Sequence, residues 1–355
     1  MASPVESFPV TNSRPASRGW TIAPGVTNIG TIRMNDSAPA AAQHYYDRST
    51  GLIVFGILTI GLGGLVALLC VFMVFGLVIQ ATTSHMPLSA MIPGLLMYPC
   101  LAVALVWLGI GSVMAKRWAR NLLLIFSWTW LLGGIVVVAM MAVLLPMIMT
   151  HLPVPEGQQQ LSTPAVYAGM AIAFVFYGFF LVVLPAIWTF FYSSRHVKGT
   201  VLWRDPNPGW TDTCPLPILG TCLWLLFSAL MMAVMAFGPQ GVAPFFGIFL
   251  TGLSGRTFYI GAAAAWFIAA GLMYRVDVRG WWLALAVFVF FVLSTTVTYS
   301  LRDVTDMYKL MNFPQEQIDQ IQKMGVFTGH NAAWFTGACT LPFIGFLIFI
   351  KRYFR

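Results

Sequence analysis

The stretch GIGSVMAKRWARNL, residues 109–122, determines how the rest of the chain is organised. A long apolar run ends here, three cations and a tryptophan follow within five residues, and a second apolar run begins. Lysine and arginine stay in water on the cytoplasmic side of a membrane, and tryptophan prefers the level of the lipid headgroups. The pattern therefore predicts a tight cytoplasmic turn between two membrane-spanning helices.

The composition of the whole chain indicates the same class of protein. Hydrophobic residues make up 59% of the 355 residues and charged residues only 8%, whereas soluble proteins average roughly 25% charged. Several apolar runs exceed the roughly 18 residues that indicate a membrane span. The net charge of +8 comes from cations near the ends of these runs, not from a surface suited to nucleic acid. We therefore predict an integral membrane protein that contacts the lipid bilayer and binds no nucleic acid.

Eight apolar segments are predicted to be spans. They cover residues 51–79, 98–115, 121–150, 164–192, 215–237, 257–274, 280–301 and 331–350. With eight spans, fifteen lysines and arginines fall on one side of the membrane and four on the other. Because cytoplasmic loops carry the excess of cations, we predict that both termini are cytoplasmic. The Trp-Ala-Arg turn at residues 118–120 resembles a turn of many bacterial multi-pass proteins without assigned function, which implies a bacterial inner membrane. The predicted cytoplasmic anchors are Lys116, Arg117, Arg120, Arg275 and Arg279.

The chain is predicted to consist of a tail, two membrane halves and a linker. Residues 1–49 are rich in Pro, Ser, Ala, Thr and Gly, which predicts a disordered cytoplasmic tail. This tail lacks the apolar segment of a cleavable signal peptide, and whether it carries a targeting signal stays open. The first half covers residues 50–198, a polar cytoplasmic linker covers residues 199–214, and the second half covers residues 215–355.

The two predicted halves resemble each other. A shift of 159 residues aligns the two basic turns, and a shift of 157 aligns the last span of each half. The aligned pairs include Trp107 with Trp266, Lys116 with Arg275, Arg120 with Arg279, and Pro185 with Pro342. Four spans per half is an even number, so the halves would share one orientation, related by an axis along the membrane normal. The sequence thus predicts an all-α membrane protein with two tandem four-helix halves.

Two shorter apolar pieces, residues 86–97 and 243–254, are not predicted to be spans. Each has about 12 residues, or roughly 18 Å as a helix, which is too short for a hydrocarbon core of about 30 Å. We expect both pieces to lie along the outer interface, or to enter the membrane and return.

Pro185 and Pro342 lie inside predicted spans. Each frees the carbonyl four residues earlier and bends its helix. One interpretation is a pair of hinges beside a pathway. The simpler interpretation, which we favour, is proline tolerated because neighbouring groups satisfy the freed carbonyl.

Residues 302–329 are the only long polar insertion on the predicted outer side. Apolar residues at 304, 307, 308 and 311 are spaced to extend the preceding helix, Asn312 and Pro314 break it, and Ile318, Ile321 and Met324 form a second apolar stripe. We predict an amphipathic αα-hairpin. It either caps the protein's own surface, docks a protein partner or a second copy, or forms a lid over a path between the halves. The candidate docking face is Ile318, Ile321 and Met324.

The predicted spans carry no Asp, Glu, Lys or Arg away from their ends. Ion-coupled transporters usually need such groups near the middle of the membrane, and the sequence has no common nucleotide-binding, metalloprotease or hydrolase motif in a usable context. We predict no catalytic residue, cofactor or metal site. The favoured function is a non-catalytic membrane scaffold or accessory subunit. The alternative is a transporter or channel for a neutral or lipophilic solute, with a path between the halves.

Overall fold

The structure is a computed structural model that describes residues 46–83, 92–151, 163–238, 241–323 and 329–354. Nearly all of the predicted tail, residues 86–91 of the first apolar piece, and Met324 lie outside the described residues. The disorder of the tail therefore stays a prediction.

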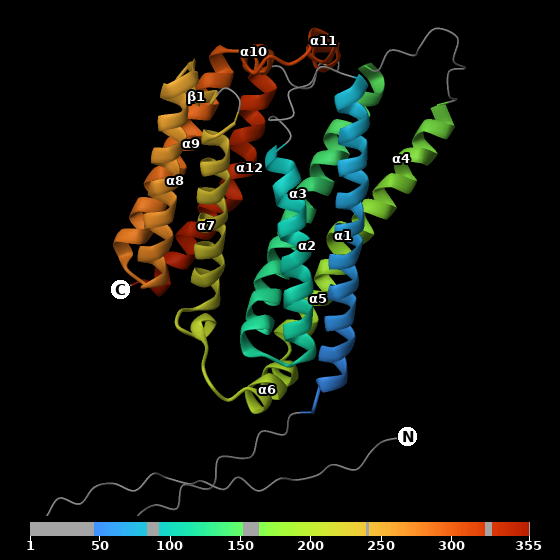
Figure 1. The fold of residues 1–355 in the computed structure, drawn as a ribbon, viewed down its shortest axis with the longest axis vertical. Coiled ribbons are helices and arrows are strands. Elements are labelled where there is room, and N and C mark those ends of the chain that lie inside the picture. The colour runs from blue at the N-terminus through green and yellow to red at the C-terminus, as the bar shows by residue number, and fades with distance from the viewer. Residues whose placement is uncertain (1–45, 84–91, 152–162, 239–240, 324–328, 355) are drawn as a thin grey trace, which may run out of the picture. The chain divides into compact units, whose positions relative to one another are not determined.

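Four consecutive helical segments form the first half (Figure 1). They are α1 (Ser49–Thr83), α2 (Ile92–Val113), α3 (Arg117–His151) and a fourth segment made of α4 (Thr163–Gly178), the π-helix η2 (Phe179–Val183) and α5 (Leu184–Ser193). Long runs of uncharged apolar residues become helices because a helix satisfies its own backbone polar groups inside lipid. In this half α1 packs along α2, and α3 packs along η2 and α5.

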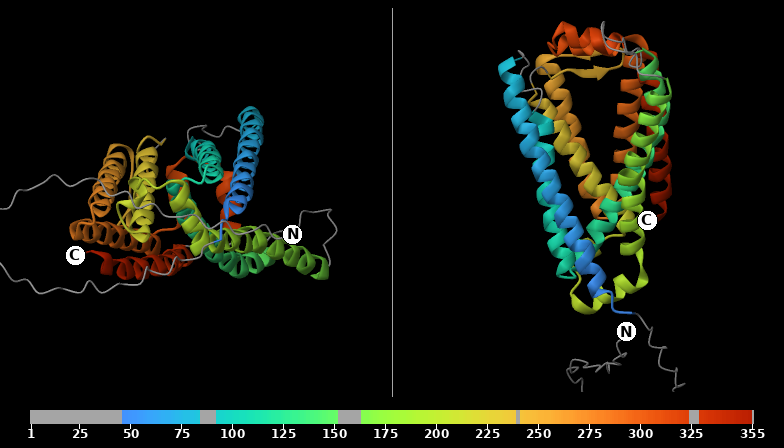
Figure 2. Two further views of the ribbon diagram at one scale, coloured as in Figure 1. Left: turned by 90° about the horizontal axis from the view of Figure 1, so that it is seen from below. Right: turned by 90° about the vertical axis from the view of Figure 1, so that its right-hand side faces the viewer.

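The second half repeats this order of packing. It contains α7 (Leu216–Ala236), α8 (Gly252–Tyr274), α9 (Val278–Leu301) and α12 (Gly329–Ile350). Here α7 packs along α8, and α9 packs along both α8 and α12 (Figure 2, left). In each half, therefore, the first two long helices form one pair and the last two form another.

Within the described residues, six helical segments are long and apolar enough to cross a membrane. They are Ser49–Leu77, Arg117–Leu144, Tyr167–Ser193, Leu216–Ala236, Gly252–Tyr274 and Val278–Leu301. The fold is that of a helical integral membrane protein. Helices α2 and α12 correspond to the other two predicted spans, but they are not among the six segments. A total of eight spans therefore stays a prediction. Because α2 begins at Ile92, residues 92–97 of the first short apolar piece are part of this helix, which corrects the prediction of a separate piece there.

The core of the first half contains buried residues from α1, α2, α3, α5 and α6. The Ser112 hydroxyl lies 2.7 Å from the Tyr192 hydroxyl and donates to the Leu52 carbonyl at 3.1 Å. Close by in the same core, the Trp188 indole N–H donates to Thr59 Oγ1 at 3.2 Å. These bonds connect α1, α2 and α5. Such interhelical hydrogen bonds hold membrane helices together, because lipid provides no hydrophobic force between them.

The two basic turns share one backbone geometry. Ala115 in the first turn and Val276 in the second have positive φ angles of 52° and 59°. In each turn the amide of the next residue donates to the carbonyl five positions earlier, at 2.9 Å and 3.1 Å. This is the Schellman ending of a helix, which usually has glycine at the left-handed position. Here the turn forms around Ala and Val instead.

One glycine tightens each of these turns. A Cβ on Gly111 would lie 2.6 Å from the Cβ of Ala119, and a Cβ on Gly280 would lie 2.7 Å from that of Leu272. Position 111 of the first turn corresponds to position 272 of the second, and position 119 corresponds to position 280. Both pairs are 161 residues apart, two more than the shift of 159 used in the sequence comparison. The shared geometry concerns the turns, and the repeat of whole halves stays a prediction.

The predicted polar loop between the halves contains a helix, which corrects the sequence analysis. Helix α6 covers Arg195–Arg204, and the short 3-10 helix η3 covers Trp210–Asp212. Val197 and Val201, four residues apart on α6, are each 1% exposed and belong to the first-half core. The predicted boundary at residue 199 therefore falls inside a packed helix. Two valines among polar residues were too weak a signal to predict this.

The apolar piece at residues 243–254 forms a β-hairpin and the start of α8, so it is not a span. Strand β1 (Ala243–Phe245) pairs antiparallel with β2 (Ile248–Leu250). The two turn residues, Phe246 and Gly247, have positive φ angles of 40° and 94°, as a two-residue hairpin turn requires. This small two-stranded sheet (Figure 2, right) is a local addition to a fold that is otherwise helical, as the predicted all-α class implies.

The outer insertion contains two short helices, α10 (Val304–Leu310) and α11 (Gln315–Lys323), which pack against each other (Figure 1). The prediction that the preceding helix continues into this region is wrong, because α9 ends at Leu301 and Arg302 is extended, with φ −135° and ψ 144°. Asn312, with a φ of +57°, separates α10 from α11, as predicted.

The membrane topology can be tested at two exposed positions separated by α7, α8 and α9. In a background without the five native cysteines, Asn207→Cys should react with a membrane-impermeant maleimide only from the cytoplasmic side. Glu316→Cys should react only from the outer side, because three spans place the two positions on opposite faces. Labelling of both cysteines from one side would contradict the predicted alternation.

Candidate functional site

The predicted cytoplasmic anchors differ in their packing. Arg275 and Arg279, at the turn between α8 and α9, are exposed. Lys116 and Arg117 are half-buried, and Arg120 is only 8% exposed. The cations of the first turn are therefore part of a packed region, whereas those of the second turn face the surroundings.

A polar network connects the first basic turn to η3. Arg120 Nη1 donates to Asn121 Oδ1 at 3.4 Å, and the Asn121 side-chain amide donates to Thr211 Oγ1 at 3.2 Å and to Asp212 Oδ1 at 3.1 Å. On its other side, η3 is bonded to the last residue of α8, because the Tyr274 hydroxyl donates to the Trp210 carbonyl at 2.9 Å. The short helix η3 thus joins the two halves at this end of the spans.

A residue near η3 also caps the N-terminus of α3. The Asp205 carboxylate accepts the backbone N–H of Arg117 at 3.2 Å, and an acidic group at a helix N-terminus is stabilising. Cys214 follows η3 and is buried, and burial raises the pKa of its thiol. This thiol therefore stays protonated near neutral pH and is a weak nucleophile.

Further along the spans, α3 and α7 form the junction between the halves. The Trp224 indole N–H donates to Thr129 Oγ1 at 3.0 Å, and Gly220 lies against Ile125. Interhelical hydrogen bonds and small residues are the usual means of holding membrane helices together. The junction between α3 and α7 has both an interhelical hydrogen bond and a small residue at the contact.

The two predicted kink prolines have different surroundings. Pro185 is buried at the start of α5, directly after η2, and a π-turn is a known way to absorb a break in helical bonding. The carbonyl of Leu181, which Pro185 leaves without its usual partner, faces Gly134 of α3 so closely that a Cβ there would overlap its oxygen. Pro342 lies inside α12 and is exposed. Whether either proline is a hinge stays a prediction.

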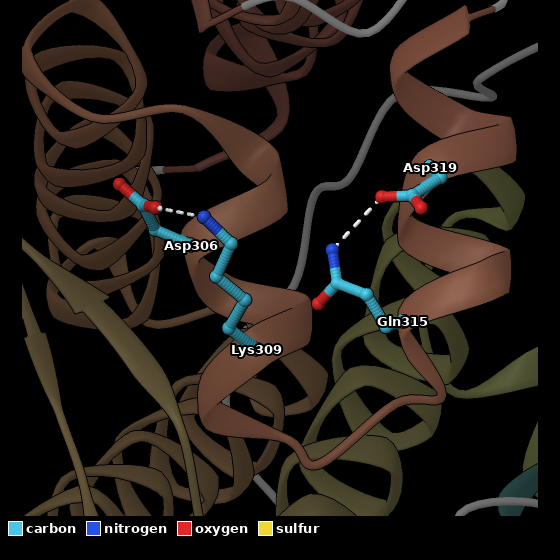
Figure 3. A network of polar contacts seen from close by, with 4 residues as sticks. All are labelled: Asp306, Lys309, Gln315 and Asp319. Carbon is cyan, nitrogen blue, oxygen red and sulfur yellow. Dashed lines mark hydrogen bonds and ion pairs between the residues drawn. The ribbon is translucent and has the colours of Figure 1, made fainter.

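The predicted docking face is partly occupied by the chain itself. Ile318 is 1% exposed and Ile321 is half-buried. The polar side of the insertion carries a pair within each helix, Asp306 with Lys309 at 3.4 Å and Gln315 with Asp319 at 2.8 Å (Figure 3). A partner approaching this insertion would meet such polar groups before Ile318. Docking at the insertion stays a prediction.

Side-chain hydroxyls on α9 hold the β1–β2 hairpin in place. Ser294 Oγ accepts the Phe246 N–H at 3.2 Å and donates to the Pro244 carbonyl at 3.1 Å, while Thr298 Oγ1 accepts the Gly247 N–H at 3.0 Å. The sequence analysis missed this arrangement. Its signal was the run STTVTYS at residues 294–300, which is unusually rich in hydroxyls for a span.

A groove of about 1020 Å³ lies below the hairpin, between α8 and α9. Its walls include Phe258, Gly261 and Ala265 from α8, and Val287, Phe290 and Phe291 from α9. Phe245 of β1 covers the hairpin end, where its ring lies 5.8 Å from that of Phe258 and 6.2 Å from that of Phe290. The groove is almost entirely apolar, so it suits hydrocarbon and not a charged ligand.

In the described parts of the chain, no group of three or more His, Cys, Asp or Glu side chains could hold a metal ion. A comparison of the chain with known protein families, curated proteins and solved structures finds no match. Any function must therefore be argued from the geometry of the chain itself.

The contact between Gly134 and Leu181 can be tested with two neighbouring glycines. Gly134→Ala should lower the free energy of unfolding by about 1–3 kcal/mol, because the added methyl overlaps a backbone carbonyl. Gly133→Ala is the matched control, since a Cβ there meets nothing within 4 Å. Thermal unfolding in detergent measures both. Equal stability of the two variants would show that the close approach is absent.

The anchoring of the hairpin can be tested on α9. Thr298→Val keeps the shape of the side chain but removes the acceptor for the Gly247 amide, and it should cost about 1–3 kcal/mol of stability. Ser300→Ala is the control, because Ser300 is exposed and its hydroxyl donates only to Thr296 in the same helix. Hydrogen exchange at residues 243–250 should rise in Thr298→Val alone. Unchanged exchange there would contradict the anchoring role.

Proposed function

We propose that this chain is a non-catalytic membrane scaffold or accessory subunit. The observation that supports this proposal is the uncovered surface of α4. Tyr167, Ile172, Val175 and Phe176 are 65%, 71%, 74% and 57% exposed, and they point in several directions around the helix. Within the described residues α4 packs mainly against η2 and one part of α3. Most of its surface is left to lipid or to another protein.

The sequence of α4 suits contact with a second helix. Gly169 and Ala173 are four residues apart, and small residues at this spacing allow two helices to approach closely. A Cβ on Gly169 would meet nothing within 4 Å, so no described residue packs against this glycine. A partner helix could therefore lie along α4 without disturbing the fold, as an accessory subunit requires.

The proposal includes a topology of eight spans in two tandem halves, with both termini in the cytoplasm of a bacterium. Its supports are the excess of cations at one set of turns and the shared geometry of the two basic turns. The same pairing of long helices in both halves also favours it.

The alternative is a transporter or channel for a neutral or lipophilic solute. The apolar groove between α8 and α9 favours this alternative. The groove lies within the second half, whereas α3 and α7 form the junction between halves and are joined there by the Trp224–Thr129 hydrogen bond. We therefore rank the scaffold first.

The scaffold proposal predicts that α4 is a contact surface. The tagged full-length chain would be cross-linked in its native membranes, purified, and the recovered proteins quantified by mass spectrometry. A partner present in stoichiometric amount should be lost from Gly169→Leu, because a large side chain prevents close helix contact. Gly271→Leu is the control, since this glycine on α8 is also exposed with open space around it.

Both variants should unfold at the temperature of the unmodified chain, which separates loss of contact from loss of fold. A second copy of the chain, detected with two different tags, also counts as a partner. Recovery that is the same for Gly169→Leu and Gly271→Leu would contradict the role of α4. Absence of any stoichiometric protein with the unmodified chain would contradict the scaffold itself.

A further inference from the structure

The groove between α8 and α9 has fixed walls. Both helices are among the segments that are long and apolar enough to cross a membrane. The hairpin that covers one end of the groove is bonded to Ser294 and Thr298 of α9, and it is also bonded to α8, because the Tyr259 hydroxyl donates to the Val242 carbonyl at 2.7 Å. The cover is therefore tied to both walls, so the groove is a built feature of the second half.

The floor of the groove is open at one position. A Cβ on Gly261 would meet nothing within 4 Å, although Phe258 and Phe290 line the walls around it. Gly261 is exposed, so the groove opens to the surroundings of α8 and is filled by whatever lies there. Water gains no hydrogen bonds from such walls. Something apolar from the membrane must fill the space.

The length of the groove distinguishes a lipid chain from a protein helix. Along α8 it extends from Leu253 to Ala265, which is roughly 18 Å of helix. The lining from α8 ends at Ala265; the next residue, Trp266, is 5% exposed, and its ring centroid lies 6.3 Å from that of Phe291. One leaflet of the hydrocarbon core is about 15 Å deep, half of about 30 Å. The groove could hold only about half the length of a membrane-spanning helix, whereas it could hold the full length of an acyl chain from one leaflet.

We propose that this groove binds the acyl chains of a membrane lipid from the leaflet on the hairpin side. Its walls are aromatic and aliphatic, and the residues that line it include no charged side chain, so the site selects by hydrocarbon shape and not by headgroup charge. Ser254 and Thr257 lie near the headgroup end. Their hydroxyls already donate to carbonyls of Thr251 and Leu253, which leaves oxygen lone pairs to accept from a headgroup. This inference goes beyond the scaffold proposal and does not depend on a protein partner.

Photolabelling tests the proposal on the full-length chain. The protein would be reconstituted in phosphatidylcholine vesicles in which a small fraction of the lipid carries a diazirine in the middle of one acyl chain. After irradiation, mass spectrometry of peptides locates the adducts. Phe258 and Phe290 should be labelled several-fold more than Ile260, which is 52% exposed on another face of α8 at a similar depth.

Filling the groove should remove this excess. Gly261→Leu places a side chain in the open space, and Ala286→Phe fills the groove from α9 if the first variant does not fold. Gly271→Leu is the control outside the groove and should label like the unmodified chain. Labelling of Phe258 and Phe290 that only equals that of Ile260, or that persists in the filled variants, would overturn the proposal.

A second copy in the groove would also overturn the proposal and has its own signature. In a cysteine-free background, Gly261→Cys would then form a disulfide-linked dimer on oxidation, and Phe258 and Phe290 would be protected from the lipid probe. The proposed acyl site predicts a monomeric Gly261→Cys chain that stays labelled at Phe290.

Discussion

Backbone amides and carbonyls inside a membrane have no water to bond with, and this constraint governs each irregular part of the chain. The β1–β2 hairpin lies at the end of two spans, where its turn amides at Phe246 and Gly247 are bonded to hydroxyls of Ser294 and Thr298. Where Pro185 interrupts a helix, a π-turn and a close approach to α3 cover the freed carbonyl. At the hairpin, the departure from regular helix occurs where hydroxyls of another helix accept the backbone N–H groups.

The same scarcity of polar partners explains how the helices are joined. Lipid gives no hydrophobic reason for two apolar helices to associate, so hydrogen bonds and small residues must provide the contact. Ser112 and Tyr192 do this in the first half, and Trp224 with Thr129 does so between the halves. Helix α4 has few such contacts within the described residues. Its exposed surface is therefore where we propose that another protein binds.

Local patterns in the sequence were sufficient to locate the long helices. The predicted span at residues 215–237 corresponds to α7, Leu216–Ala236, and the basic turn falls between α2 and α3 as its cations indicated. The hairpin and α6 were not predicted. Hairpin residues such as Phe245 and Ile248 are apolar, like a short piece of helix, and α6 is stable because Val197 and Val201 reach a core formed by distant helices.

The sequence by itself determined the membrane class and the positions of the long helices, because apolar run length and charge at the turns act locally. The tertiary structure alone decided that Arg120 is buried while Arg275 is exposed. It also created the groove between Phe258 and Phe290. Such features depend on residues far apart in the chain, whose approach is set by helix packing, and no pattern within a single apolar run records which neighbour that run will meet.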